Sequence, residues 1–201
     1  MTFLDRLALP EDARARELRA ALQARILVLD GSMGSQLAAS GLSAADFGGA
    51  AQEGCYDVLP VTKPGAVAAV HERYLAAGAD IIETCSFGAL RHVLAEYGLA
   101  ERTAELNFAA AALAAECARR AATARQPRFV AGSMGPGTKT ITLTGGISFA
   151  EVAAAHAEQA RALIAGGVDL LLLRPSRTPS TSRPRSAASP TASSLWAAAC
   201  R

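Results

Sequence analysis

A short apolar run followed at once by an acid and two glycines constrains the fold of this chain more than any other feature. Ile26 to Leu29 contains β-branched residues and is followed by turn residues, which is typical of a strand buried on both faces in a parallel sheet. Asp30 comes next, and Gly31 and Gly34 allow the backbone to turn tightly and approach another group closely. In α/β proteins a strand that ends in this way typically presents a site.

Three further apolar runs have the pattern of strands, and helical patterns separate them. We predict strands at 79–85, 128–132 and 168–173, helices at 10–25, 64–77, 90–97, 101–124 and 148–164, and a long loop at 41–60. Ser148 and Glu151 have the spacing of a capping box, while Gly78 and Gly98 are placed to end helices. Strands that alternate with helices indicate βα units, so the predicted fold class is α/β with a parallel sheet.

Composition and cysteine spacing favour a single domain with a substantial core in a cytoplasmic protein. The chain has 201 residues, 51% hydrophobic and only 5% aromatic, which is enough for one core built mostly from Ala, Leu, Val and Ile. No apolar run approaches the ~18 residues of a membrane helix, and we expect no membrane partner. The four cysteines form no C-x-x-C pair and have no zinc-module spacing, so we expect free thiols. The three histidines are expected at surface or boundary positions.

The net charge of +2 conceals an asymmetry between the body of the chain and its last residues. Arg174 to Arg201 holds five of the 20 basic residues and no acid, which leaves 15 basic residues against 18 acids before it. The body therefore has no basic face for nucleic acid, and we expect no nucleic-acid partner. Residues 174–201 are rich in Ser, Pro and Arg without periodicity, which predicts a disordered tail.

Three motifs in order resemble the homocysteine S-methyltransferase family. They are I-L-V-L-D-G-S-M-G (26–34), K-P-G-A-V-A-A-V-H-E-R-Y-L-A-A-G-A-D-I-I-E-T (63–84) and V-A-G-S-M-G-P-G-T-K (130–139). The similarity spans about 22–173 and is greatest to the homocysteine-binding domain of cobalamin-dependent methionine synthases. It implies that 1–173 form about four βα units, the N-terminal half of a (βα)8 TIM-type barrel.

The resemblance also implies a reaction. Homocysteine is the substrate, zinc holds its thiolate, and methylcobalamin is the methyl donor in the cobalamin-dependent members, so that methionine is the product. Residue by residue, the substrate-binding positions that match the family are Asp30, Gly31, Glu83, Thr84, Cys85, Ser133, Gly135 and Pro136. Asp30 is the acid expected near the amino group. Cys85 stands where the family usually has Asn.

Two departures from the family put activity in doubt. The family's zinc ligands are a Cys after the sixth strand and a Cys-Cys pair after the eighth, and this sequence has neither, so no metal ligands are predicted. The fourth strand of the family ends in Glu-Thr, with the Glu contacting homocysteine, whereas this chain has Arg174-Pro175. We therefore expect a truncated chain that does not transfer methyl groups.

A reading-frame change is one hypothesis for residues 174–201. A family-like continuation E-T-F-Q-D-T-L-N-V-K, with suitable codons and one base lost, reads R-P-S-R-T-P-S-T-S-R, which is the sequence of 174–183. Sequencing the locus tests this hypothesis, since absence of family-like coding in the shifted frame would remove it.

Several alternatives stay open at the level of sequence. Asp30 could only cap the glycine turn, Glu83 could be a structural acid, and Cys85 could be a small buried residue. The chain could be a non-catalytic half-barrel that self-associates or complements a separately encoded half. Gly132 to Thr140 invites interpretation as a phosphate-binding loop, although Thr138 separates the second glycine of the Walker spacing from the lysine.

Overall fold

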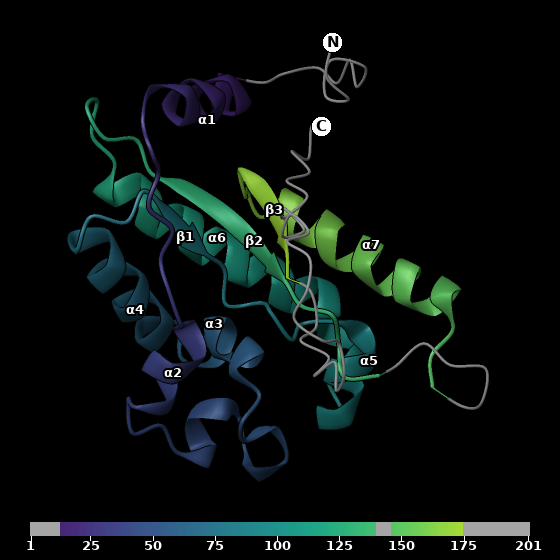
Figure 1. Ribbon diagram of the computed structural model, residues 1–201. Helices are drawn as coiled ribbons and strands as arrows, with labels where there is room; N and C mark the ends of the chain where they lie inside the picture. The colour runs from purple at the N-terminus through teal and green to yellow at the C-terminus, as the bar shows by residue number, and fades with distance from the viewer. Residues whose placement is uncertain (1–12, 140–145, 175–201) are drawn as a thin grey trace, which may run out of the picture.

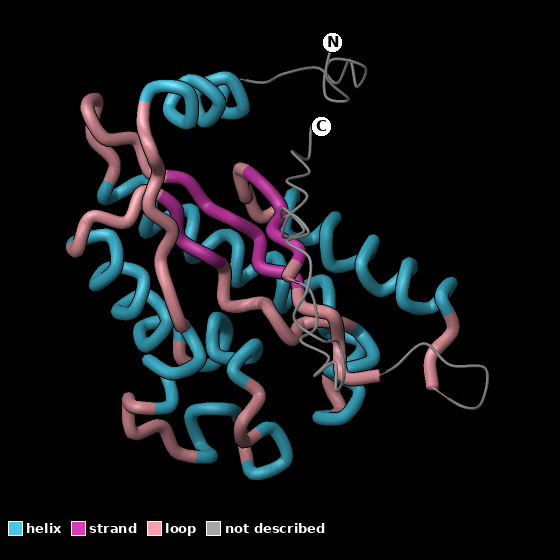
Figure 2. The backbone as a smooth tube through the Cα atoms, viewed as in Figure 1, coloured by secondary structure: helices cyan, strands magenta, loops and turns pink. Residues whose placement is uncertain are grey.

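The computed structural model describes residues 13–139 and 146–174, and within them the chain has an α/β fold with a parallel sheet (Figures 1 and 2). The strands are β1 (Ile81–Glu83), β2 (Phe129–Met134) and β3 (Leu170–Leu173). The α-helices are α1 (Ala13–Ala24), α2 (Met33–Ala38), α3 (Leu59–Thr62), α4 (Pro64–Ala76), α5 (Arg91–Leu94), α6 (Thr103–Ala121) and α7 (Phe149–Ala165). The predicted disordered tail falls, except for Arg174, outside the described residues.

The strands follow one another across the sheet in chain order, β1-β2-β3, and every pairing is parallel. Ile81 is the register partner of Phe129, and Ser133 that of Leu172. Helices precede each of β1, β2 and β3 in the chain. The strands predicted at 79–85, 128–132 and 168–173 are therefore confirmed, with slightly shifted bounds, and they alternate with helices as predicted.

The first predicted strand is shorter than expected and is not buried on both faces. The segment before Asp30 joins the sheet through a single parallel bridge between Leu29 and Ile81. Leu29 packs on the core, but Ile26 is 89% and Val28 56% exposed. The prediction was wrong because this segment lies at the edge of the described sheet, where its outward side chains have no covering element among the described residues.

The alternation of side chains along the strands divides the sheet into two faces. Ile81, Phe129, Ala131, Leu170 and Leu172 point to one face, where they form a core cluster together with Leu18 of α1. The opposite face carries Ile82, Val130, Met134 and Leu171, which pack against α4, α6 and α7. Helices α4, α6 and α7 thus pack on one face of the sheet (Figure 1). The polar residues described below continue the rows of the opposite face at the carboxyl ends of the strands.

Helix α1 closes the amino ends of the strands and is held there by acids. Arg14 donates to both oxygens of Asp169 (2.9 and 3.1 Å) and to the Arg128 carbonyl at 2.7 Å, and its guanidinium lies 4.9 Å from the Phe129 ring centroid. Asp80, only 2% exposed, accepts from both Arg25 terminal nitrogens at 2.7 Å. These ion pairs and hydrogen bonds therefore stabilise the amino-terminal end of the sheet.

The carboxyl ends of the strands are covered by α2, α3 and the segment between them. The predicted loop at 41–60 is instead a series of short 3-10 turns, at Ala44–Phe47, Ala50–Gln52 and Tyr56–Val58, that leads into α3. Phe47 and Tyr56 meet edge to face at 5.7 Å, and Phe47, Val58 and Leu59 belong to the largest core cluster. The loop prediction failed because composition alone does not reveal apolar side chains spaced to fit such turns.

Local helix signals were reliable. Ser148 and Glu151 form the predicted capping box at the start of α7, and Gly78 and Gly98 adopt positive φ angles (105° and 70°) after their helices. His71 contradicts expectation, because it is fully buried on α4 and burial lowers its pKa to about 4. His92 and His156 are partly buried, as boundary positions should be.

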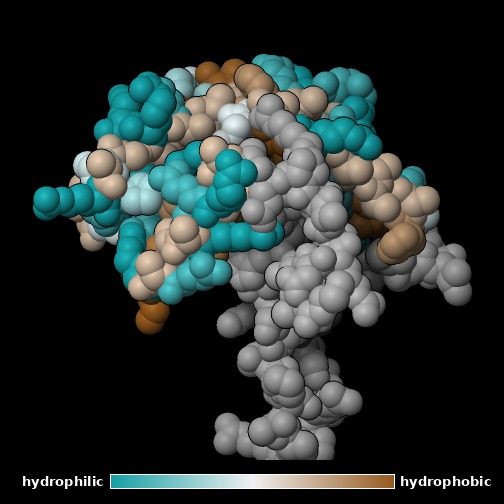
Figure 3. Space-filling view, turned by 90° about the horizontal axis from the view of Figure 1, so that it is seen from above, coloured by the Kyte–Doolittle hydropathy of each residue, from teal (hydrophilic) through white to brown (hydrophobic). Residues whose placement is uncertain are grey.

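Polar and apolar residues are interspersed on the face shown in Figure 3. Within the described ranges, no helix combines the length and apolar character that crossing a membrane requires.

Candidate functional site

A cavity of about 490 Å³ opens at the carboxyl ends of the strands, beneath α2 and the turn that precedes α3. Its walls come from four parts of the chain: 31–34, 56–57, 83–88 and the ends of β2 and β3. The residues that line it are Gly31, Ser32, Met33, Gly34, Tyr56, Asp57, Glu83, Thr84, Cys85, Ser86, Phe87, Gly88, Ser133 and Arg174. Five of the eight predicted site residues are in this set, so the structure brings these five together around one cavity.

The strand period explains why polar groups meet here. Glu83, Ser133 and Arg174 continue the rows of inward-facing residues on β1, β2 and β3, one step beyond the apolar layer. The Ser133 hydroxyl donates to Glu83 Oε2 at 2.7 Å, and Arg174 Nη1 lies 3.2 Å from each Glu83 carboxylate oxygen. A buried carboxylate is thereby held between a hydroxyl and a guanidinium.

A buried hydrogen-bond network forms the floor of the cavity. The Ser133 N–H donates to Thr84 Oγ1 (2.9 Å), which lies 2.6 Å from Ser86 Oγ, and the Ser86 hydroxyl donates back to the Ser133 carbonyl (2.8 Å). Behind them, Gln159 Nε2 of α7 donates to the Ser86 carbonyl (2.7 Å) and to Asn107 Oδ1 of α6 (3.2 Å). These hydrogen bonds hold the floor of the cavity in place, although the buried Gln159 Oε1 has no hydrogen-bond partner among the described residues.

Asp30 lies next to the cavity and positions β1 instead of lining the cavity wall. The backbone N–H of Glu83 donates to both Asp30 carboxylate oxygens, at 3.0 and 3.1 Å. Burial raises the pKa of Asp30 to about 7, in spite of this hydrogen bond, and the nearby Glu83 carboxylate adds to the rise. The Asp30 carboxyl therefore titrates near neutral pH, where its protonated and ionised forms are both present.

This raised pKa predicts a pH-dependent stability. The unfolded chain ionises Asp30 near pH 4, whereas the folded chain keeps the proton to about pH 7, so stability attributable to Asp30 is lost as pH rises between these values. We expect Asp30→Asn to gain about 2 kcal/mol over the wild type on going from pH 5 to pH 8, measured by urea unfolding. Asp46→Asn is the control, because the pKa of Asp46 is lowered to about 2 and does not titrate in this window. Equal pH slopes for wild type and Asp30→Asn would contradict the prediction.

Asp57 also lines the cavity and was not identified from the sequence. Its Oδ1 accepts from the Gly88 N–H at 3.0 Å, and burial raises its pKa to about 6. A Cβ at Gly88 would lie 2.6 Å from Asp57 Oδ2, so a larger residue there would displace the Asp57 carboxylate. An acid directly before the apolar pair Val58-Leu59 was the only signal in the sequence, and without the fold it does not point to a site.

Cys85 lines the cavity as a protonated thiol. Its Sγ donates to the Tyr56 carbonyl at 3.4 Å, and burial raises its pKa well above the ordinary value, while that of Cys55 is raised to about 11. Cys55, Cys85 and Cys117 are free and buried, as expected for ordinary thiols, and Cys200 lies outside the described residues. Metal ligation requires a thiolate, so these surroundings do not favour Cys85 as a ligand. Within 13–139 and 146–174 no group of three or more His, Cys, Asp or Glu is arranged to hold a metal ion.

Gly135 and Pro136 are not among the residues that line the cavity. The Gly135 N–H donates to the Phe87 carbonyl at 3.0 Å, and a Cβ at Gly135 would lie 2.5 Å from that oxygen and 2.9 Å from the Phe87 ring. Gly135 thus lets β2 approach the segment that carries Phe87, which does line the cavity.

The repeated G-S-M-G sequence adopts two different structures. In the first copy Ser32 caps α2, whereas in the second Ser133 and Met134 belong to β2. The Ser133 and Gly135 N–H groups are already bonded to Thr84 and Phe87. These bonds take up donors that a phosphate cradle needs, and they do not favour the phosphate-loop alternative.

A parallel α/β sheet with a polar cavity at the carboxyl ends of its strands defines the class of α/β proteins that bind small molecules at that edge. Within this class the chain belongs to the homocysteine S-methyltransferase family. The model of that family, described as homocysteine S-methyltransferase, matches residues 27–178, which is well over half of the chain.

Relatives agree with this assignment. Methionine synthase of Mycobacterium tuberculosis is 39% identical over 152 residues, and that of Mycobacterium leprae is 38% identical over 157. These matches cover 76% and 78% of this chain but only 12% and 13% of those proteins. Among solved structures, the metallated form of the homocysteine methyltransferase MmuM from Escherichia coli is 28% identical with a TM-score of 0.60, over 78% of this chain and 56% of MmuM.

Proposed function

We propose that this chain binds homocysteine in the cavity between Glu83 and Asp57, as the homocysteine-binding part of a homocysteine S-methyltransferase of the methionine synthase type. The observation that carries the proposal is the convergence of Glu83, Thr84 and Ser133, which were singled out from the sequence as homocysteine contacts, on one cavity. Family membership supports the choice of substrate.

The chemistry of the cavity suits an amino acid with a sulfur side chain. The Asp57 carboxylate can accept hydrogen bonds from an ammonium group. Met33, Cys85 and Phe87 give the rest of the wall a soft, apolar character that fits a thiol on a short methylene chain. The cavity volume of about 490 Å³ is ample for such a ligand.

We propose further that residues 1–173 contribute about four βα units of a TIM-type barrel. The sequential strand order and the position of α4, α6 and α7 on one side of the sheet support this arrangement. The TM-score of 0.60 to MmuM over 56% of that protein is consistent with it. On this proposal, the exposed side chains of Ile26 and Val28 lie where a complete barrel would continue.

Zinc and methylcobalamin belong to the family reaction, but the described residues do not fit zinc. Cys85 and Cys55 are protonated thiols, and the side chains around the cavity do not form a metal-ligand group in the described residues. Zinc would favour the thiolate of the substrate. We therefore propose that this chain binds and orients homocysteine without transferring a methyl group itself.

Calorimetric titration with L-homocysteine tests the binding proposal. We expect saturable binding to the wild type and at least tenfold weaker binding to Glu83→Gln, because glutamine keeps the shape of the side chain but loses the charge that holds the Arg174 guanidinium beside the Ser133 hydroxyl at the cavity. Glu116→Gln is the matched control, since Glu116 is an exposed residue of α6 paired with Arg119. Absence of homocysteine binding to a folded wild-type chain would refute the proposal.

An assay with methylcobalamin and homocysteine tests the second part. We expect no methionine above the uncatalysed background, with or without added zinc. Turnover by the isolated chain would show that it supplies the missing chemistry by another route and would overturn this part of the proposal.

A further inference from the structure

Arg174 is a basic side chain in a cavity whose other charged lining residues are acids. The lining residues include Asp57 and Glu83, and Arg174 is the one lining residue with a cationic side chain in the described part of the chain. The family resemblance implies a glutamate at the end of this strand, so the sign of the charge at this point is reversed. Such a reversal changes which end of a zwitterionic ligand the wall attracts.

The backbone holds Arg174 firmly at this place. Its N–H donates to the Met134 carbonyl at 3.0 Å, which extends the β2–β3 ladder by one residue beyond Leu173. By strand alternation its side chain lies on the same face as Ser133 and Leu172. The guanidinium therefore reaches the cavity as a continuation of a strand.

Arg174 has donors to spare. Its Nη1 lies 3.2 Å from both Glu83 oxygens, while Nη2 and Nε have no hydrogen-bond partner among the described residues. The side chain keeps 55% of its surface exposed. A guanidinium presents a planar fork of donors that matches a carboxylate, so the two remaining nitrogens can donate hydrogen bonds to a ligand carboxylate.

The same contacts leave Glu83 with little to offer a cation. One carboxylate oxygen accepts from the Ser133 hydroxyl, and both lie beside Arg174, so its charge is already compensated. Asp57, which also lines the cavity, accepts from the Gly88 N–H and has no ion pair in the described residues. Among the described residues, the cavity thus offers spare guanidinium donors at Arg174 and a carboxylate without an ion pair at Asp57.

We propose that Arg174 recognises the carboxylate of the ligand, so that this cavity selects a thiol by its carboxylate more than by its ammonium group. The inference rests on the proposed function, because it concerns the same cavity and the same class of ligand. It goes further by assigning ligand orientation and selectivity to a residue at which the chain departs from its family.

Three thiols separate the two ends of the ligand. L-Homocysteine carries both charged groups, 4-mercaptobutanoate has only the carboxylate, and 3-mercaptopropan-1-amine has only the ammonium. By calorimetry on the full chain under reducing conditions, we expect 4-mercaptobutanoate to bind the wild type within about tenfold of homocysteine, and the amine at least about tenfold more weakly than homocysteine.

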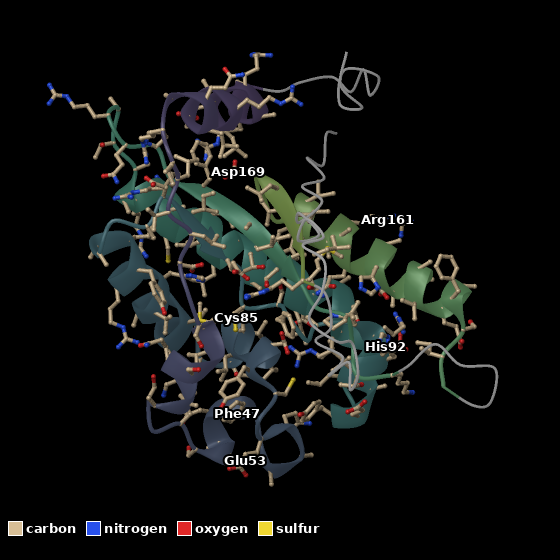
Figure 4. All side chains as sticks on the ribbon, in the orientation of Figure 1. Phe47, Glu53, Cys85, His92, Arg161 and Asp169 are labelled. Atoms are coloured by element: carbon tan, nitrogen blue, oxygen red, sulfur yellow. The ribbon has the colours of Figure 1, made fainter. Side chains whose placement is uncertain are left out.

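Two substitutions then assign the selectivity to Arg174. Arg174→Gln should weaken both carboxylate ligands about tenfold or more with little effect on the amine, and Arg174→Glu should reverse the preference in favour of the amine. Arg161→Gln is the matched control, because Arg161 is exposed on α7 (Figure 4) and should change nothing. Since the comparison of three ligands on the wild type stands by itself, misfolding of a variant would not obscure the result.

The outcomes separate this inference from the function on which it rests. If homocysteine binds but the amine binds the wild type equally well, or if Arg174→Gln weakens all three ligands alike, Arg174 is not the carboxylate contact and only this inference fails. If none of the three thiols binds the folded wild type, the proposed function fails as well.

Discussion

Replacing Asp80 by Ala is expected to lower the free energy of unfolding by about 3 kcal/mol, because it leaves buried cationic and amide donors without their acceptor. Asp80 accepts from Arg25 twice at 2.7 Å and from the Val28 N–H at 2.9 Å, and Arg128 lies 3.7 Å away. Arg25 is 41% exposed and can recover hydration, but Arg128 is only 8% exposed and cannot.

Urea unfolding at pH 7 measures this effect, and Glu116→Ala is the control. Glu116 pairs with Arg119 on the exposed face of α6, so its loss should leave the free energy of unfolding almost unchanged. The hydrogen bond from Arg25 lowers the pKa of Asp80 to about 2. The stabilisation is therefore present above about pH 4 and is lost as pH falls toward 2. An Asp80→Ala protein as stable as the control would show that the amino ends of the strands are held by packing alone.

The second large effect is expected at Gly135, where Ala should destabilise the fold by about 2–3 kcal/mol. The added Cβ would lie 2.5 Å from the Phe87 carbonyl oxygen, which belongs to the backbone and cannot move aside as a side chain can. Relief requires that β2 and the 84–88 segment separate, which also breaks the hydrogen bond from the Gly135 N–H.

Gly34→Ala is the matched control because Gly34 is the last residue of the first G-S-M-G copy. It lies in α2 with nothing within 4 Å of an added Cβ, so Ala should be neutral or stabilising there by up to about 1 kcal/mol. The two variants are compared by urea unfolding. Similar stabilities would mean that the contact between β2 and the Phe87 segment is loose enough to admit a methyl group.

Local and periodic features of the fold could be predicted from the sequence. A capping box such as Ser148 with Glu151 involves neighbours in sequence, and glycines such as Gly98 respond to a local backbone requirement. The strand period likewise implies that Glu83 and Ser133 share the strand-end edge. These signals do not depend on which other segments pack nearby.

The rest depended on contacts between distant segments. Asp57 enters the cavity only because the turns before α3 pack against α2, α4 and α5 in one core cluster. Burial of His71 and exposure of Ile26 are set by which elements cover them, and the spacing of residues along the chain does not reveal this. Arg174 could be recognised as a departure from the family, but not as the partner of Glu83 across two strands.

The floor of the cavity is tied to the back of the molecule. The Ser86 hydroxyl donates to the Ser133 carbonyl, and the Ser86 carbonyl accepts from Gln159 Nε2 of α7. The same Gln159 nitrogen donates to Asn107 Oδ1 of α6. The shape of the cavity therefore depends in part on how α6 packs against α7. Substitutions between α6 and α7, which do not contact a ligand directly, can therefore change the shape of the cavity. Selectivity can then evolve without any change in the residues that line the cavity.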